Sequence, residues 1–161
     1  MGLPASILLF QLLHAAGLAL WFSVVALNNL RAFAASAGAV GATMAMTPLK
    51  QPPAIDIPLL SRAINSSLIA RLALLLILGL QIAAACACWI GCYHLLAAGD
   101  LVAARTWLNL ALSTAVAFLL AMHLGGLWFG YWMRQESLQI THLVMLIWMA
   151  AMFFLFNADW A

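Results

Sequence analysis

Four histidines are the side chains of this sequence best suited to chemistry: His14, His94, His123 and His142. A neutral imidazole binds haem iron or copper, and it carries a proton near neutral pH. Each histidine belongs to a different long apolar stretch of the chain. A polar ring in apolar surroundings is costly unless it is paired or ligated, so each histidine is a candidate functional residue.

Two of these histidines are predicted to lie at the same depth if the stretches are helices that cross a bilayer. At a rise of about 1.5 Å per residue, His14 lies roughly 14 Å from one membrane surface and His123 roughly 12 Å from the other. A haem b group held between helices needs level ligands, so His14 and His123 are candidate haem ligands. His123 with His142 fits less closely. The alternative is that each histidine bonds to a neighbouring helix or lies among lipid headgroups.

The fourth apolar stretch carries three methionines on the same side as its histidine. Imidazole and thioether groups together suit Cu(I). The candidate copper ligands are His142, Met145, Met149 and Met152. The alternative is that the methionines fill the core of a helix bundle, where this side chain is common.

Other reactive arrangements are missing from the sequence. The apolar stretches contain no acidic pair, and no Ser-His-Asp set or phosphate-binding glycine loop is evident. The three cysteines, Cys86, Cys88 and Cys92, lie on one predicted helix and cannot form a four-cysteine zinc site. A net charge of +2 from dispersed basic residues argues against a nucleic-acid partner. We therefore expect a protein that is not an enzyme.

The composition identifies the elements that must position these side chains. Of the 161 residues, 68% are hydrophobic and only 6% are charged, whereas a soluble domain has about 25% charged residues. So few charges predict an integral membrane protein in contact with the lipid bilayer. Four apolar stretches are long enough to span it, at about residues 7–27, 72–96, 106–132 and 138–156. Because each is continuously apolar, we expect an all-α, four-helix transmembrane bundle forming a single domain, 1–161.

The long loop over residues 28–71 indicates how the chain is oriented. This side of the membrane carries five basic residues, namely Arg31, Lys50, Arg62, Arg71 and Arg134, and the other side carries only Arg105. Basic loops stay in the cytoplasm, so both termini are expected on the periplasmic side of a bacterial inner membrane. Within the loop, Ala32–Met46 is predicted to form a helix along the membrane surface. The proline-rich part, Thr47–Pro58, is predicted to be extended and irregular.

Small residues at a spacing of four predict where the helices approach one another closely. One such stripe comprises Gly79, Ala83, Ala87 and Gly91, and Gly126 with Gly130 forms a GxxxG pair. A second stripe comprises Ala84, Cys88 and Cys92. Aromatic residues near the predicted span ends are expected to anchor the chain at the membrane interface: Trp107, Trp128, Tyr131, Trp132 and Trp160.

Several segments together resemble a bacterial family of predicted small integral membrane proteins whose domain has no known function. The matching segments are Val24–Asn29, Met44–Thr47, Arg62–Ile64 and, best of all, Gly125–Trp132. They cover nearly the whole chain in the order and spacing of the family. The sequence departs from the family pattern at Leu127, where the family has Glu, and it lacks the Trp-Asn-Gly that follows. The resemblance implies four helices and an inner membrane, and it implies no reaction.

A shorter resemblance covers only the first predicted helix. The stretch His14–Trp21 is similar to the opening of the copper-resistance membrane family and of some haem-linked membrane proteins. In those families this histidine binds copper or haem, so the resemblance supports His14 as a candidate ligand.

Two functional hypotheses follow from the sequence. The first is a non-catalytic accessory subunit of a larger membrane complex, respiratory or otherwise redox-active, that needs no cofactor of its own. The second is a self-sufficient membrane protein that binds haem b through His14 and His123, or copper through His142 and the methionines.

Overall fold

Four long helices dominate the computed structural model, which describes residues 3–158. They are α1 (Leu3–Arg31), α4 (Ser67–Tyr93), α5 (Leu101–Trp128) and α6 (Glu136–Asn157). All four are long and apolar enough to cross a membrane. The prediction of an all-α, four-helix transmembrane bundle is therefore confirmed. Trp160, one of the predicted interfacial aromatic residues, lies outside the described residues.

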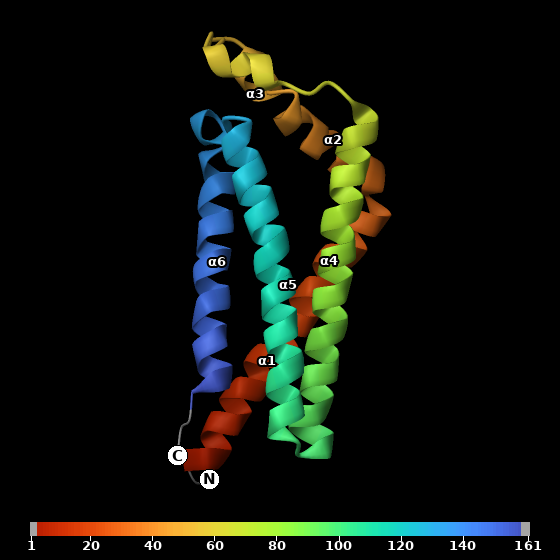
Figure 1. Ribbon diagram of the computed structural model, residues 1–161, viewed down its shortest axis with the longest axis vertical. Helices are drawn as coiled ribbons and strands as arrows, with labels where there is room; N and C mark the ends of the chain where they lie inside the picture. The colour runs from red at the N-terminus through yellow and green to blue at the C-terminus, as the bar shows by residue number, and fades with distance from the viewer. Residues whose placement is uncertain (1–2, 159–161) are drawn as a thin grey trace.

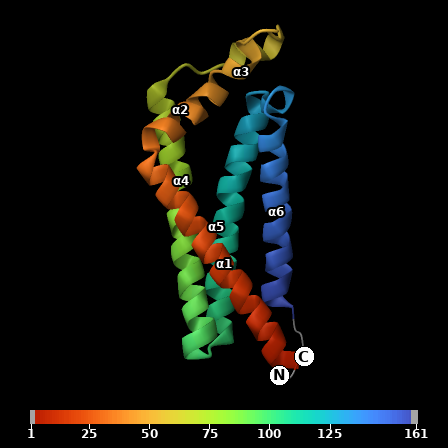
Figure 2. The same cartoon turned by 180° about the vertical axis from the view of Figure 1, so that it is seen from behind.

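The helices are arranged so that α1 begins and α6 ends at the same end of the bundle (Figure 1). Helix α5 lies between α4 and α6, and α1 crosses the others obliquely, as the view from behind shows (Figure 2). The segment between α1 and α4 forms the opposite end, which we call the loop end.

Helices α4 and α5 begin at residues that differ from those predicted from hydrophobicity, because capping hydrogen bonds set where each helix starts. The side chain of Ser66 accepts a hydrogen bond from the Ile69 amide, and that of Asp100 accepts one from the Ala103 amide. Such N-caps satisfy free amides of the first helical turn. Helix α5 therefore begins at Leu101 rather than Thr106. It ends at Trp128 rather than Trp132, so the predicted third span is shifted toward its start.

The segment at the loop end contains α2 (Phe33–Met44), α3 (Thr47–Lys50) and a 3₁₀ helix, η1 (Pro58–Arg62). Helix α2 corresponds to the predicted helix, and it packs against α4. Helix α3 corrects the prediction that this part is wholly irregular. Pro48 lies in its first turn, where a missing amide hydrogen costs no helical hydrogen bond.

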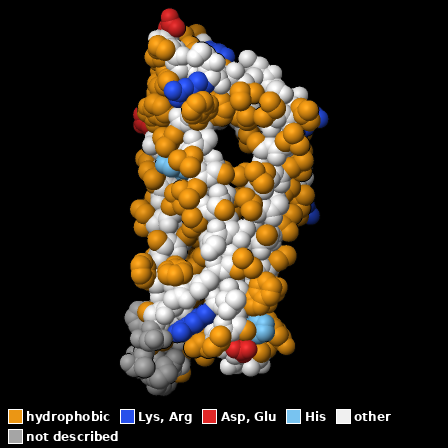
Figure 3. All heavy atoms as spheres, in the orientation of Figure 1, with side chains coloured by type: hydrophobic (Ala, Val, Ile, Leu, Met, Phe, Trp, Pro, Cys, Tyr) orange, Lys and Arg blue, Asp and Glu red, His pale blue; other side chains and the backbone are white. Residues whose placement is uncertain are grey.

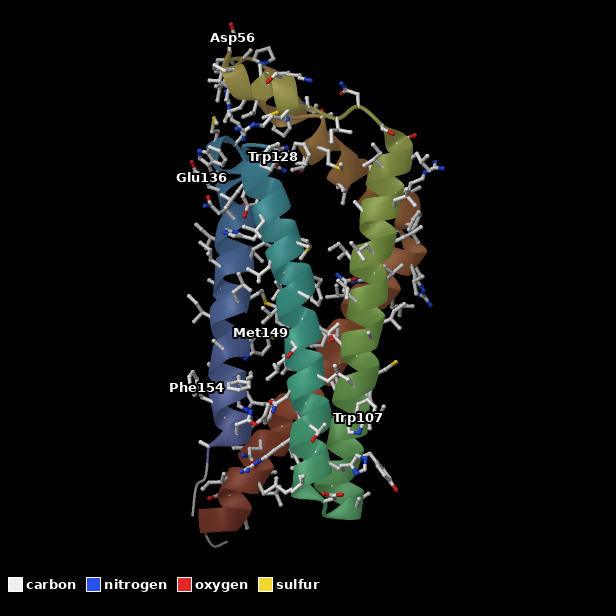
Figure 4. The ribbon with its side chains drawn as sticks, viewed as in Figure 1. Asp56, Trp107, Trp128, Glu136, Met149 and Phe154 are labelled. Atoms are coloured by element: carbon white, nitrogen blue, oxygen red, sulfur yellow. The ribbon has the colours of Figure 1, made fainter. Side chains whose placement is uncertain are left out.

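The outer surface of the bundle is apolar along most of its length, as expected for helices in contact with lipid (Figure 3). The core is built from alanine, leucine, cysteine, methionine and phenylalanine side chains, and Phe22 of α1 makes an edge-to-face contact with Phe118 of α5. Met149 points from α6 toward α5, whereas Phe154 points away from the bundle (Figure 4). Charged Asp56 lies at the tip of the loop end.

The small residues of α4 divide into a buried group and an exposed group. Ala87 and Gly91 are buried, but Gly79 and Ala83, which belong to the same predicted stripe, are exposed. The second stripe, Ala84, Cys88 and Cys92, is buried in the core. The contact between helices thus follows the second stripe and the later half of the first.

Polar links fasten α1, α5 and α6 together at the end opposite the loop end. Gln11 donates from Nε2 to the carbonyl oxygen of Leu155 over 2.8 Å. Asn109 and Asn157 exchange two hydrogen bonds, each Nδ2 donating to the other's Oδ1 over 2.8 and 2.7 Å. We call this group the polar clasp.

Leucine at either asparagine of the polar clasp should destabilise the bundle. In Asn109→Leu, the partly buried side chain of Asn157 loses both hydrogen bonds to Asn109 and keeps only the bond from its Nδ2 to the Phe153 carbonyl oxygen, at a cost of about 1–2 kcal/mol in free energy of unfolding. The double variant, Asn109→Leu with Asn157→Leu, should lose less than the sum of the single variants, because neither amide is then left unpaired. Unfolding in mixed detergent micelles measures the free energy of unfolding of the two single variants and of the double variant. Strictly additive losses would contradict a coupled pair.

Candidate binding cavity at the loop end

A cavity of about 550 Å³ opens between α2, α4, α5 and α6 near the loop end. Figure 3 shows it as an opening through the molecule. Its walls are mostly aliphatic, and none of the lining residues is Asp, Glu, Lys or Arg. The polar lining residues are Asn29, Ser36, Thr43, Gln81, Tyr131, Gln135 and His142. Cavities of this size and mixed lining are typical of small-molecule sites.

Three aromatic rings pack together at the α5–α6 wall of the cavity. Tyr131 Oη lies 2.7 Å from His123 Nδ1, within hydrogen-bond distance. The Tyr131 ring stacks on His142, with ring centroids 6.0 Å apart and planes at 24°. The two imidazoles are perpendicular, with centroids 6.4 Å apart. We call these three residues the ring cluster.

The turn after α5 brings Tyr131 back into the bundle. Gly130 adopts a φ of 69°, in the left-handed region that favours glycine, and η3 (Tyr131–Met133) follows it. The tyrosine ring then lies against Gly126, where a Cβ atom would come within 2.6 Å of it. The GxxxG spacing predicted that Gly126 and Gly130 form a pair on one helix. This prediction is wrong, because α5 ends before Gly130. Gly126 leaves room for the Tyr131 ring, and Gly130 provides the left-handed turn that follows α5.

Tyr131 is buried instead of lying at the membrane interface, where its position near a span end predicted it. Only 2% of its surface is exposed. Burial raises the pKa of its phenol above the ordinary value, so the group stays neutral at physiological pH. A neutral phenol keeps its hydrogen-bonding capacity and adds no charge to the cavity.

Two hydrogen bonds between side chains brace other walls of the cavity. Asn29 of α1 donates from Nδ2 to Oε1 of Gln81 on α4 over 2.9 Å. Thr43 of α2 donates to Oε1 of Gln135, beside the start of α6, over 3.3 Å. The second bond joins the two sides of the cavity at the loop end.

His142 is a buried polar side chain to which no hydrogen bond is found within residues 3–158. It is 7% exposed, and its Nδ1 is buried and unbonded among the described residues. Its interactions within that part of the chain are ring contacts with His123 and Tyr131. Buried polar groups nearly always have partners, so an orphaned imidazole in a cavity wall indicates a ligand-binding position.

His14 and His123, the predicted haem ligands, are not brought together. His123 is five residues before the end of α5, about 8 Å along its axis from the loop end. His14 lies eleven residues after the start of α1, so it is at most about 17 Å from the opposite end. Since α5 is about 42 Å long, roughly three helical turns separate the two levels.

These two side chains therefore do not fit a haem held between them. The depth estimate from sequence extended the third span to Trp132, which placed His123 too near the middle of the bilayer. Moreover, His14 Nδ1 lies 2.8 Å from the carbonyl oxygen of Phe10. Pairing His123 with His142 fits no better, because the ring of Tyr131 packs against both imidazoles and occupies the space that a macrocycle would need.

The candidate copper ligands lie along one buried face of α6, and the structure separates them into two groups. Met145, Met149 and Met152 are buried in the apolar core, whereas His142 lines the cavity. No group of three or more His, Cys, Asp or Glu side chains able to hold a metal is found between residues 3 and 158. The three methionines pack in the core, and copper binding by this face of α6 stays a prediction.

Of the polar residues that line this cavity, the sequence singled out only His142 as a binding residue. Tyr131 was expected at the membrane interface, and the other five were given no binding role. The available signal was the glycine pair around an aromatic segment, Gly126 and Gly130, which is as typical of a turn as of helix packing.

Comparison with known proteins identifies the family of this chain. Residues 7–158 match a family described as "Predicted small integral membrane protein (DUF2165)". No curated protein and no solved structure shows a significant match. The match spans the four helices, the ring cluster and every lining residue of the cavity. The chain therefore belongs to this family of small integral membrane proteins.

Proposed function

We propose that the protein is a non-catalytic accessory subunit of a larger bacterial inner-membrane complex, respiratory or otherwise redox-active, to which it contributes a binding cavity. The observation that carries this proposal is the uncharged cavity with the orphaned His142 in its wall. Its lining offers polar groups that orient a ligand and contains no carboxylate and no charged side chain. Such a site holds a molecule without transforming it.

The exposed small residues of α4 support a partner in the membrane. Gly79 and Ala83 face away from the bundle, and a Cβ atom at Gly79 would meet no atom within 4 Å. Small residues on a lipid-facing helix allow the backbone of another helix to approach closely. The basic residues of the loop end favour a cytoplasmic location for this end.

Purification from native membranes in a mild detergent tests this function. We expect intact-mass spectrometry to find the chain in a stoichiometric complex with a larger membrane protein, and the Gly79→Leu variant to lose that partner. Gly17→Leu is the matched control, since Gly17 is also exposed with no atom near its Cβ position. A chain that purifies alone and catalyses a reaction would overturn the proposal. So would a haem absorption band that disappears in His14→Ala and His123→Ala.

A further inference from the structure

We infer that the cavity at the loop end binds an isoprenoid quinone, a neutral ring with two carbonyl acceptors and a long apolar tail. This inference rests on the proposed role of the cavity as a binding site. Three features of the lining support it in turn: its lack of charge, its unpaired hydrogen-bond donors, and its apolar walls with an opening between helices.

The lack of charge excludes the headgroups of most membrane lipids. A phosphate group inside the bundle needs a cationic partner, because burying an unpaired charge is far more costly than burying a neutral polar group. None of the residues around the cavity is Arg, Lys, Asp or Glu. Its occupant is therefore neutral.

The unpaired donors come from two different helices, α4 and α6. Gln81 on α4 uses its amide oxygen to accept from Asn29, which leaves the two N–H bonds of its Nε2 directed elsewhere. No partner of this Nε2 is found among the described residues, although the side chain is only 3% exposed. His142 on α6 brings an imidazole whose one N–H is likewise unpaired in the described part of the chain.

Gln81 and His142 line one cavity from different helices, and each carries an N–H without a partner in the described part of the chain, which favours a ligand with acceptors at two separate points. The two carbonyl oxygens of a quinone lie on opposite sides of its ring and meet this requirement. A sterol or a fatty alcohol has a single hydroxyl group and leaves one buried donor unpaired, which is costly.

The remaining lining suits the ring and the tail. Besides the polar groups, the walls are formed largely by apolar side chains such as Leu74, Ile77 and Met122. The opening seen in Figure 3 lies between helices whose outer faces are apolar. A long tail leaves the cavity there without crossing a polar layer.

Titration of the purified chain with decylubiquinone tests the inference. Binding to the folded state stabilises it by RT ln(1 + L/Kd), where L is the ligand concentration, so the rise of the melting temperature with ligand concentration gives an affinity. We expect a rise that follows this logarithmic dependence, and a loss of about tenfold in affinity in each of His142→Leu and Gln81→Leu, since each removes one hydrogen bond. His14→Leu is the matched control and should bind as the wild type does, because His14 is remote from the cavity.

A second variant keeps the test decisive if the leucine substitutions unfold the chain. Gly125 lines the cavity, and a Cβ atom there would meet nothing within 4 Å. Gly125→Leu should fill the cavity, keep the fold and abolish the shift. Decylubiquinone that gives no shift in the wild type, or an equal shift in Gly125→Leu, would overturn the inference, as would a larger shift with phosphatidylglycerol or cholesterol. The titration uses the isolated chain, so a negative result would contradict quinone binding alone. The accessory-subunit proposal is tested separately by the purification experiment.

Discussion

The Gly126→Ala variant should lose stability and the ring cluster together. The added methyl group would lie 2.6 Å from two carbon atoms of the Tyr131 ring, which is buried and packed against both histidines. The ring must move, and overpacking of this kind costs about 1–3 kcal/mol in free energy of unfolding. Its displacement should also lengthen or break the hydrogen bond to His123.

The adjacent glycine provides a matched control on the same helix. At Gly125 a Cβ atom meets nothing within 4 Å, so Gly125→Ala should be neutral or stabilising by up to about 1 kcal/mol, through the higher helix propensity of alanine. Unfolding of both variants in mixed micelles, monitored by helical circular dichroism, gives the two free energies. Equal values for Gly125→Ala and Gly126→Ala would show that Tyr131 does not occupy this position.

Gly91→Ala should weaken the contact between α4 and α5. A Cβ atom at Gly91 would come within 2.7 Å of Leu108 Cγ and within 3.4 Å of the Leu108 backbone nitrogen. Cγ is not the free end of the side chain, and Leu108 is 1% exposed, so neither the leucine nor the helix behind it has room to move. We expect a loss of about 1–3 kcal/mol, measured by the same unfolding experiment.

The matched control for Gly91 comes from the other end of the same predicted stripe. Gly79 is exposed, with no atom within 4 Å of its Cβ position, so Gly79→Ala should leave the stability of the isolated chain unchanged or slightly higher. If Gly79→Ala proved as destabilising as Gly91→Ala, the whole stripe would pack within the bundle, contrary to the structure.

The number of membrane spans can be predicted from the sequence because burying even one charged side chain in lipid is costly, so each charged residue marks the end of an apolar stretch. Asp100 and Glu136 interrupt the hydrophobic stretches, and neither can lie deep in lipid. The helix ends are less predictable from hydropathy, since they depend on single hydrogen bonds and backbone angles. Because of the cap at Asp100 and the positive φ of Gly130, α5 begins and ends several residues earlier than predicted.

The candidate site could be predicted only in part, because its residues come together through tertiary packing. The histidines were recognised from their cost in an apolar environment, and His123 and His142 do lie in the ring cluster. Their partner, Tyr131, depends on a turn that folds the chain back onto the helix it has just left. The cavity itself depends on the tilt of α1 and on α2, and neither is encoded by periodicity along one helix.

The polar clasp has a consequence for how this molecule responds to an occupant. Its bonds among Gln11, Asn109, Leu155 and Asn157 fix the spacing of three helices at one extremity. At the far extremity, the loop end is joined to α5 and α6 by the Thr43–Gln135 hydrogen bond, by Arg134 donating to the Pro53 carbonyl oxygen, and by the Arg62 guanidinium over the Trp128 ring. Both extremities are therefore fastened, so a guest enters a frame whose helix spacing is already set.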